Sequence, residues 1–117
     1  MKQNEIRDIS LAPSGRQKIE WVKNNMPILS GLEAQLSKEK PFQGVKISLS
    51  VHLEAKTAYL CEVLAAGGAD MSVTGSNILS TQDDIAAALA ATGMKVYAYH
   101  GATPEEYNRH IEMALSH

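Results

Sequence analysis

The chain has 117 residues, of which 44% are hydrophobic and 21% charged, and this composition is typical of one folded domain rather than a disordered or collagen-like chain. Eleven basic residues stand against thirteen acidic ones, a formal net charge of −2, so we expect no nucleic-acid partner, which would favour a basic surface. The single cysteine, Cys61, excludes an internal disulfide and a zinc site built from cysteines. No apolar run approaches the roughly 18 residues of a membrane span, and the polar first ten residues do not resemble a signal peptide. We therefore expect a cytoplasmic protein with no membrane partner.

Residues 1–42 predict an N-terminal helical arm. The first ten residues lack periodicity, and Ser14 is a candidate N-cap for a helix that continues to Lys23. Met26-Pro27 interrupts this helix, because the residue before a proline is disfavoured in the α region. Pro27 suits the first turn of a second helix, which Lys38-Glu39-Lys40-Pro41 ends. Its expected apolar stripe consists of Ile28, Leu29, Leu32 and Leu36.

Residues 43–117 predict a partial α/β domain in which strands and helices alternate as βαβαβα. The expected strands are 45–49, 71–74 and 96–99. The first expected helix is 54–66, with Tyr59, Leu60, Val63 and Leu64 inward, and the second is 82–92, capped by Ser80 or Thr81. The last expected helix begins at Thr103-Pro104 and carries Tyr107, His110, Ile111, Ala114 and Leu115. Short connections between such elements imply right-handed crossovers and a parallel sheet. The fold class is therefore α/β, a Rossmann-like parallel sheet of about three strands with flanking helices, preceded by two N-terminal helices.

Polar residues follow each of the three expected strands. Ligands of an open parallel sheet bind beyond the carboxyl ends of its strands, so these residues are the candidate site. In chain order they are Ser50, His52, Glu54, Lys56 and Thr57, then Thr74, Ser76, Asn77, Ser80, Thr81, Gln82, Asp83 and Asp84, and finally His100.

Taken singly, these residues leave their roles open. His52 suits acid–base work, because an imidazole exchanges protons near neutral pH, but a lone histidine is also typical of a structural or exposed position. Glu54 alone favours a first-turn carboxylate that stabilises a helix, and Asn77 alone an Asx turn. His100 reads as a strand terminator or as a second wall of the same cleft.

Several catalytic and cofactor motifs are missing from the sequence. It has no glycine-rich dinucleotide fingerprint, no phosphate-binding P-loop, no G-x-S-x-G elbow and no H-E-x-x-H zinc motif. Asp83 and Asp84 alone are too close together to form a metal cage, so we expect no metal site. The residues by themselves predict a ligand-binding edge with incomplete catalytic equipment.

Six segments resemble adenosylhomocysteinase. The resemblance covers essentially the whole chain but only the amino-terminal part of a protein several times longer. The longest matching segment, Gly75 to Leu89, looks like that family's first signature. The others are Asp8-Ile9-Ser10-Leu11-Ala12, Ile19-Glu20-Trp21, Met26-Pro27 together with the run at 38–41, and His52-Leu53-Glu54-Ala55-Lys56-Thr57.

The resemblance implies a role in the reversible hydrolysis of S-adenosylhomocysteine to adenosine and homocysteine, a step of the methyl cycle. In that family a tightly held NAD oxidises the ribose 3′ hydroxyl, and the resulting ketone acidifies the neighbouring C4′ proton. The segment resembles the first half of the substrate-binding domain, so the NAD-binding domain and other catalytic residues would lie downstream and this chain alone would be inactive. The family assembles as homo-oligomers, typically tetramers.

Residue by residue, the resemblance gives each candidate a role. His52 matches the catalytic histidine close to the ribose. Glu54, Lys56 and Thr57 match positions around the adenine, and Asn77, Ser80, Thr81 and Gln82 match the loop that shapes the substrate pocket.

The sequence departs from the family's common pattern at Lys56, Glu54, Ile78 and Ile85, of which the last two are expected to change packing only. Lys56 stands where many members carry Glu or Gln, a position linked in some relatives to an alkali cation, and its ammonium would take the cation's place. Glu54 stands where many members carry Thr. Because a lysine only donates hydrogen bonds and a 6-oxo purine accepts them, Lys56 suggests a variant that prefers S-inosylhomocysteine.

Two other classes of function stay open. One is a stand-alone nucleoside-binding or assembly module that has lost catalysis. The other is a fold remnant without a ligand, which the polar signature loop disfavours. Calorimetry with adenosine would separate them, because only a preserved pocket would bind.

Overall fold

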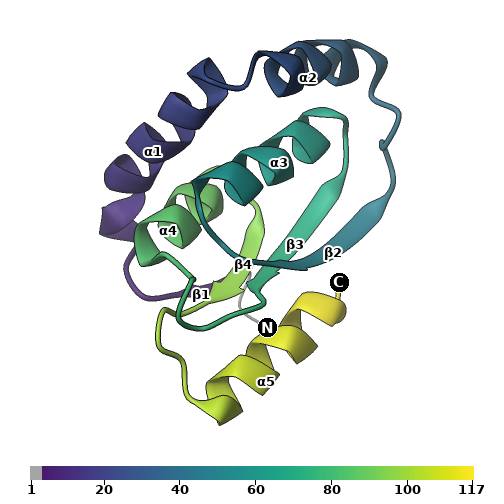
Figure 1. Ribbon diagram of the computed structural model, residues 1–117. Coiled ribbons are helices and arrows are strands. Elements are labelled where there is room, and N and C mark those ends of the chain that lie inside the picture. Colours follow the sequence, from purple (N-terminus) through teal and green to yellow (C-terminus); the bar gives the residue numbers. More distant parts are fainter. Residues whose placement is uncertain (1–3) are drawn as a thin grey trace.

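The computed structural model describes residues 4–117, and its centre is a parallel sheet of four strands (Figure 1). The strands are β1 (Glu5–Ile6), β2 (Lys46–Val51), β3 (Asp70–Gly75) and β4 (Lys95–Ala98), arranged in the order β1-β4-β3-β2. In the register of the central pairs, Leu49 lies opposite Val73, and Val73 opposite Val96. The expected α/β class with a parallel sheet is confirmed, and the expectation of about three strands is one too low.

The additional strand comes from residues that the sequence predicted to be an arm without regular structure. Glu5 pairs with Tyr97, and Ile6 with Ala98, along the free edge of β4. The carboxylate of Glu5 accepts a hydrogen bond from the Tyr99 hydroxyl at 3.0 Å and one from Arg109 of the last helix. Two residues carry no periodic pattern of their own, so this strand depends on partners more than 90 positions away.

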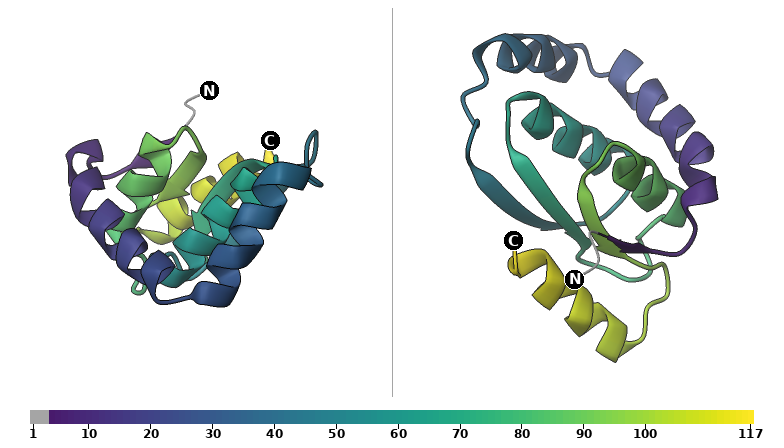
Figure 2. Two further views of the ribbon diagram at one scale, coloured as in Figure 1. Left: turned by 90° about the horizontal axis from the view of Figure 1, so that it is seen from above. Right: turned by 180° about the vertical axis from the view of Figure 1, so that it is seen from behind.

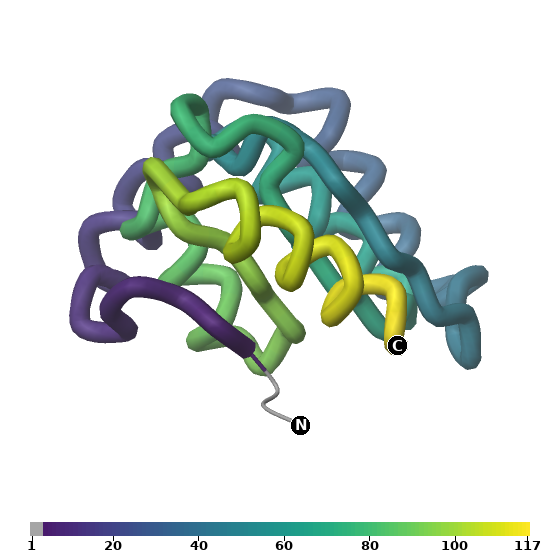
Figure 3. The backbone as a smooth tube through the Cα atoms, turned by 90° about the horizontal axis from the view of Figure 1, so that it is seen from below, coloured from purple at the N-terminus to yellow at the C-terminus, as the bar shows by residue number. Residues whose placement is uncertain are grey.

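Helices cover both faces of the sheet. Helices α3 (Ala55–Ala66) and α4 (Asp83–Ala91) lie on one face, and α5 (Pro104–Leu115) lies on the other (Figures 1 and 2). Outside α3 and α4, helices α1 (Ala12–Asn24) and α2 (Pro27–Glu39) form an outer layer, and α1 follows a short 3-10 turn at Ile9–Leu11. Figure 3, from below, shows α5 lying over this face of the sheet. Ser48 and Ser72 anchor it there, because both hydroxyls donate to the Ala114 carbonyl, at 2.7 and 2.9 Å.

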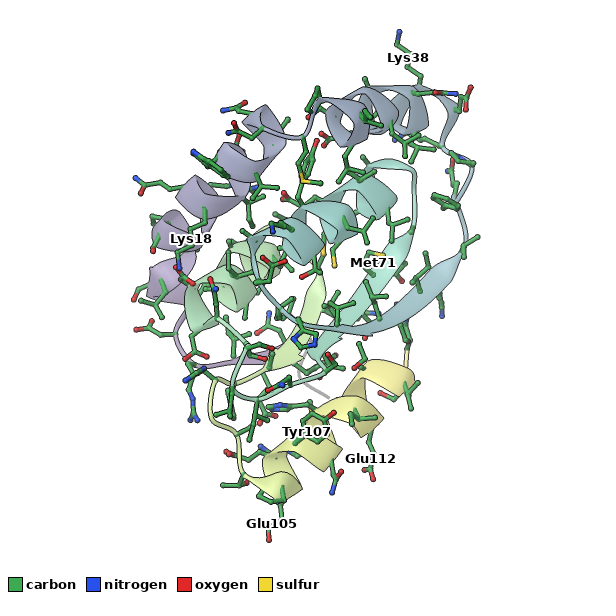
Figure 4. All side chains as sticks on the ribbon, in the orientation of Figure 1. Lys18, Lys38, Met71, Glu105, Tyr107 and Glu112 are labelled. Atoms are coloured by element: carbon green, nitrogen blue, oxygen red, sulfur yellow. The ribbon has the colours of Figure 1, made fainter. Side chains whose placement is uncertain are left out.

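The core lies mainly between the sheet and the α3–α4 layer and continues into α1. Its fully buried members come from the strands and from three helices, and include Ile19, Tyr59, Val63, Val73, Ile85, Leu89 and Val96. Met71 of β3 is labelled within this layer in Figure 4. The inward positions predicted for Tyr59 and Val63 are confirmed. Leu60, also expected inward, is 38% exposed.

The apolar stripe expected on α2 is only partly covered. Leu29 and Leu36 pack against the core, whereas Ile28 is 89% exposed and Leu32 43% exposed. Since α2 contacts mainly α3 and the end of α1, one side of its stripe meets no other part of residues 4–117. None of the helices in those residues is long and apolar enough to cross a membrane.

Helix starts are where local prediction was least accurate. Ser14 is not an N-cap: the helix begins at Ala12, directly after the 3-10 turn, and the Ser14 hydroxyl donates to Asp84 at 2.8 Å. Neither Ser80 nor Thr81 caps α4, whose N-cap is Gln82, because both hydroxyls are bonded elsewhere. The start at Thr103 is confirmed, with a capping box to Glu106.

Candidate functional site

A pocket of about 490 Å³ opens at the carboxyl ends of β2, β3 and β4, where three connecting loops meet. The loops after β2 and β3 contribute most of its wall, and the turn after β4 closes one side. The lining residues are His52, Glu54, Leu79, Ser80, Thr81, Gln82, Asp83 and His100. The structure therefore brings together five of the eight residues to which the resemblance assigns a role, whereas Lys56, Thr57 and Asn77 are not in this lining.

A hollow of similar volume, about 460 Å³, lies at the opposite end of the strands. The charged groups there pair with one another. Arg16 bonds Glu62 through two nitrogens at 2.6 Å each, and Lys23 lies 3.6 Å from Glu33. Because paired charges have little left to offer a ligand, and because open parallel sheets bind ligands at the other end, we place the site beside His52.

His52 is held in the pocket by the loop that follows β3. It directly follows Val51, the last paired residue of β2, and its side chain is exposed. The ring nitrogen Nδ1 lies 2.8 Å from Ser80 Oγ, and that hydroxyl is also 3.3 Å from the Asn77 carbonyl oxygen. A hydrogen bond between residues 28 positions apart fixes the ring where it can exchange protons with a bound ligand.

Asn77 builds the loop rather than the pocket surface. Its side-chain oxygen accepts from the Leu79 amide at 2.8 Å, the Asx turn that the sequence left open. Its carbonyl accepts from both the amide and the hydroxyl of Thr81, at 3.1 and 2.9 Å. Thr81 is 2% exposed, so these bonds pin the end of the loop under the pocket.

Glu54 and Thr57 form the capping box of α3. The Thr57 amide donates to Glu54 Oε1 at 3.0 Å, and the Glu54 amide donates to Thr57 Oγ1 at 3.3 Å. The Thr57 hydroxyl also donates to the backbone carbonyl of His52. Thr57 therefore fixes the backbone next to His52, whereas Glu54 both caps the helix and lines the pocket.

Gln82 and Lys56 lead into an adjoining hollow of about 510 Å³, which shares Glu54 and Gln82 with the pocket and includes Trp21. The backbone amide of Gln82 donates to the Leu53 carbonyl at 3.0 Å, and its side-chain oxygen accepts a hydrogen bond from Lys18 at 3.2 Å. Lys18 extends from α1, as Figure 4 shows. Lys56 is exposed and has no ion pair or side-chain hydrogen bond within residues 4–117.

His100 and Asp83 complete the pocket lining, and their roles were left open by the sequence. The His100 amide donates to Asp83 Oδ1 at 2.9 Å, and its Nδ1 lies 2.9 Å from the Thr81 carbonyl oxygen. Of the two interpretations of His100 that the sequence left open, the geometry supports the one in which it lines the pocket. The sequence signal for this position was that His100 comes shortly after an expected strand, as the residues from the other two loops of the pocket do.

Charge next to the pocket is concentrated at the start of α4. Burial raises the pKa of Asp84, but hydrogen bonds from Lys18 and Ser14 outweigh that effect and leave the pKa below its usual value. In residues 4–117 no three His, Cys, Asp or Glu side chains are grouped so as to hold a metal ion.

The parallel sheet with helices on both faces defines an α/β domain, and the polar loop edge of that sheet carries an imidazole and hydroxyls. The chain belongs to the S-adenosyl-L-homocysteine hydrolase family, whose sequence model matches residues 3–117. It is 50% identical to S-inosyl-L-homocysteine hydrolase of Methanopyrus kandleri over 112 residues, and these residues cover 96% of this chain and 26% of that protein. It is 51% identical to adenosylhomocysteinase of Pyrococcus abyssi over 110 residues, which cover 94% of this chain and 26% of that protein.

A bacterial relative gives a similar result. Adenosylhomocysteinase of Gloeothece citriformis is 48% identical over 114 residues, which cover 97% of this chain and 27% of that protein. The chain thus spans about a quarter of the length of the curated relatives it matches.

Proposed function

We propose that this chain is the N-terminal segment of the substrate-binding domain of an NAD-dependent hydrolase that cleaves S-adenosyl-L-homocysteine to adenosine and homocysteine. Family membership over residues 3–117 carries the proposal, together with the pocket in which Ser80 holds His52. Such an enzyme acts in the methyl cycle and one-carbon metabolism.

In this proposal the pocket residues divide into two groups. His52 faces the ribose and assists proton movement there, because its imidazole can both give and take a proton near neutral pH. Glu54, Ser80, Thr81 and Gln82 line the space around the nucleoside. Thr57 and Asn77 act indirectly, by holding the backbone of the two loops that carry these side chains.

No glycine-rich dinucleotide turn joins a strand to a helix in residues 4–117. A dinucleotide site needs a glycine-rich turn between a strand and a helix, so that the backbone can approach the pyrophosphate. The connection from β2 to α3 is His52-Leu53-Glu54, without a glycine, and the loop after β3 is filled by its own hydrogen bonds. NAD, which supplies the redox chemistry at the ribose, would be bound elsewhere in the longer protein, and this chain alone would not turn over substrate.

The proposal is tested by titrating the purified chain with adenosine in a calorimeter and by assaying it with S-adenosylhomocysteine and NAD. We expect binding without turnover. His52→Ala should weaken binding, whereas Lys38→Ala should not, because Lys38 is exposed at the far end of α2 (Figure 4). No binding by the folded chain would argue against the proposal.

A preference for S-inosyl-L-homocysteine is a second candidate, and Lys56 is the observation that favours it. Its ammonium is free of protein partners in the part of the chain described, and it can only donate, which suits the 6-oxo group of inosine better than the 6-amino group of adenosine. The relative from M. kandleri carries that substrate in its name. Titration with inosine and adenosine decides: Lys56→Gln should weaken inosine binding selectively, and Lys38→Gln should not. Equal or adenosine-biased affinity in the unmodified chain would contradict this candidate.

We also infer that the longer protein is a cytoplasmic homo-oligomer, with the tetramer of the family as the expected form. A single, fully buried cysteine, Cys61, suits a reducing compartment. Ile28 and Leu32 on α2 are exposed apolar side chains that assembly could cover. Light scattering on the full-length protein tests the oligomeric state, and a monomer would contradict it.

A further inference from the structure

Two adjacent residues of the signature loop each hold one histidine of the pocket. Ser80 Oγ lies 2.8 Å from His52 Nδ1, and the carbonyl oxygen of Thr81 lies 2.9 Å from His100 Nδ1. Both rings line the pocket, and neither Nε2 has a protein partner within residues 4–117. The nitrogens that remain for a ligand are therefore the two Nε2 atoms.

The partner of His100 determines which of its nitrogens carries the proton. A backbone carbonyl oxygen only accepts hydrogen bonds, so His100 Nδ1 must donate to Thr81. A neutral imidazole has a single N–H, and Nε2 of neutral His100 therefore has a free lone pair. The hydrogen bond from the His100 backbone amide to Asp83 holds the backbone in the position that lets Nδ1 reach the Thr81 carbonyl.

The Ser80 hydroxyl, which is the partner of His52, favours the opposite tautomer. The Ser80 hydroxyl has one proton and two acceptors in reach, His52 Nδ1 at 2.8 Å and the Asn77 carbonyl oxygen at 3.3 Å. That carbonyl already accepts two shorter bonds from Thr81, which occupy its two lone pairs. The Ser80 proton is thus directed to His52 Nδ1, and neutral His52 carries its own proton on Nε2.

We propose that Ser80 and Thr81 fix His52 and His100 in opposite tautomers, so that the pocket offers a ligand one N–H donor at His52 and one bare acceptor nitrogen at His100. Ser80 is then a positioning residue for His52. His100 is a second ligand-binding residue, which accepts a hydrogen bond from a hydroxyl or amino group. The identity of that ligand as a nucleoside rests on the proposed function, whereas the tautomers do not.

The same geometry lets Ser80 hold His52 in both protonation states. When His52 gains a second proton, Nδ1 becomes a donor, and Ser80 Oγ can accept that bond through a lone pair while its own proton turns away from the ring. A hydroxyl can reverse its role in this way because it both donates and accepts. A histidine that moves protons during a reaction keeps its orientation throughout.

Nitrogen-15 NMR of the labelled chain without ligand tests the proposal, because protonated and bare ring nitrogens have well-separated shifts. The spectra are recorded at about pH 8.5, roughly two units above the usual imidazole pKa, where the rings are neutral. His110 serves as an internal reference, since its Nε2 lies 3.4 Å from the Glu5 carboxylate, which at that pH only accepts. We expect His52 to match the pattern of His110 and His100 to show the reverse.

Substitutions in the same loop show whether Ser80 is responsible. Ser80→Ala should shift the His52 ring nitrogens toward the average of two tautomers and leave His100 unchanged, and Ser80→Thr, which keeps the hydroxyl, should preserve the original pattern. Ser76→Ala is the matched control, because no side-chain hydrogen bond of Ser76 exists in the part of the chain described. A proton on Nε2 of His100, one on Nδ1 of His52, or a His52 pattern unaffected by Ser80→Ala would overturn the proposal. A chain with the expected tautomers that fails to bind adenosine would contradict the proposed function instead.

Discussion

Gly75 and Thr81 fit against each other beneath the pocket: a β-carbon on Gly75 would fall well inside van der Waals contact of the Thr81 hydroxyl oxygen. That hydroxyl donates to the Asn77 carbonyl at 2.9 Å, so the last residue of β3 has to lack a side chain for the loop to close. The loop in turn places Ser80 against His52. A glycine at the end of the strand is therefore part of how the site is built.

Replacing Gly75 tests this packing. Gly75→Ala should lower the free energy of unfolding by about 1–3 kcal/mol, the usual cost of overfilling a packed position, because Thr81 is buried and cannot simply move aside. Urea denaturation followed by circular dichroism measures the change.

Gly31 provides the matched control for that substitution. It lies inside α2, and a β-carbon there would meet nothing within 4 Å. Gly31→Ala should therefore raise the free energy of unfolding by about 1 kcal/mol through helix propensity alone. If both variants changed stability in the same direction, the close fit of Gly75 and Thr81 would not explain the effect.

The ion pair between α1 and α3 gives a second prediction. Arg16 reaches Glu62 with two nitrogens at 2.6 Å each, a geometry that a lysine cannot reproduce. Arg16→Lys should cost about 1 kcal/mol in urea denaturation at low salt, and the loss should shrink at high salt.

A weaker pair serves as the comparison for Arg16. Lys95 and Asp70 are 3.8 Å apart, and Asp70 is about half exposed, so Lys95→Gln should change stability by less than about 0.5 kcal/mol. Equal effects of Arg16→Lys and Lys95→Gln would contradict a special role for the two-nitrogen contact.

Sequence patterns located most of the fold because the signals involved are local. Alternation and glycine-bounded runs found β2, β3 and β4, and Thr103-Pro104 marked the start of α5 correctly. The strand at Glu5–Ile6 was missed because its stability comes from β4 and from Arg109, far along the chain. Ser80 and Thr81 were misread as helix caps because their actual bonds, to His52 and Asn77, are tertiary or loop contacts.

The candidate site was predictable to the level of the loops but not of the individual contacts. The rule that ligands bind at the carboxyl ends of parallel strands brought His52, Ser80 and His100 to one edge. It could not show that Gln82 is tied to Lys18, or that Lys56 lines an adjoining hollow beside Trp21. Those contacts involve α1, whose packing against α4 is not encoded in any local motif.

Acid stability tests the pairing of β1. Hydrogen bonding to Arg109, and then to Tyr99 and His110, lowers the pKa of Glu5 from 4.5 to about 2 against the opposing effect of burial. Because the pKa is lower in the folded chain, Glu5 contributes its full stability above pH 4.5 and loses it as the pH falls toward 2.

The comparison variant is Glu5→Gln, which cannot titrate. The difference in free energy of unfolding between the unmodified chain and this variant should be largest near neutral pH and should shrink as the pH falls from about 5 to about 2. Denaturant titrations at several pH values measure it. A difference independent of pH would mean that Glu5 is not held by these charges.

Cys61 should be chemically silent in the folded chain. It is fully buried, and burial, with a smaller effect of Glu62, raises the pKa of its thiol to about 12, so almost no thiolate is present near pH 8. A thiol reagent at about pH 8 should label it only after urea unfolds the chain, with Cys61→Ala as the unlabelled control. Rapid labelling in the absence of urea would contradict the burial of α3 against the sheet.

The most direct test of the central claim is to map adenosine binding on the chain by amide chemical-shift changes in one NMR titration. The account predicts shifts that saturate with adenosine at His52, Ser80, Gln82 and His100, which line or border the pocket, and none at Gly67 or Gly93, at the opposite end of the strands. Shifts confined to the opposite end, or no saturable shifts in the folded chain, would contradict the claim that this segment forms one wall of a nucleoside site.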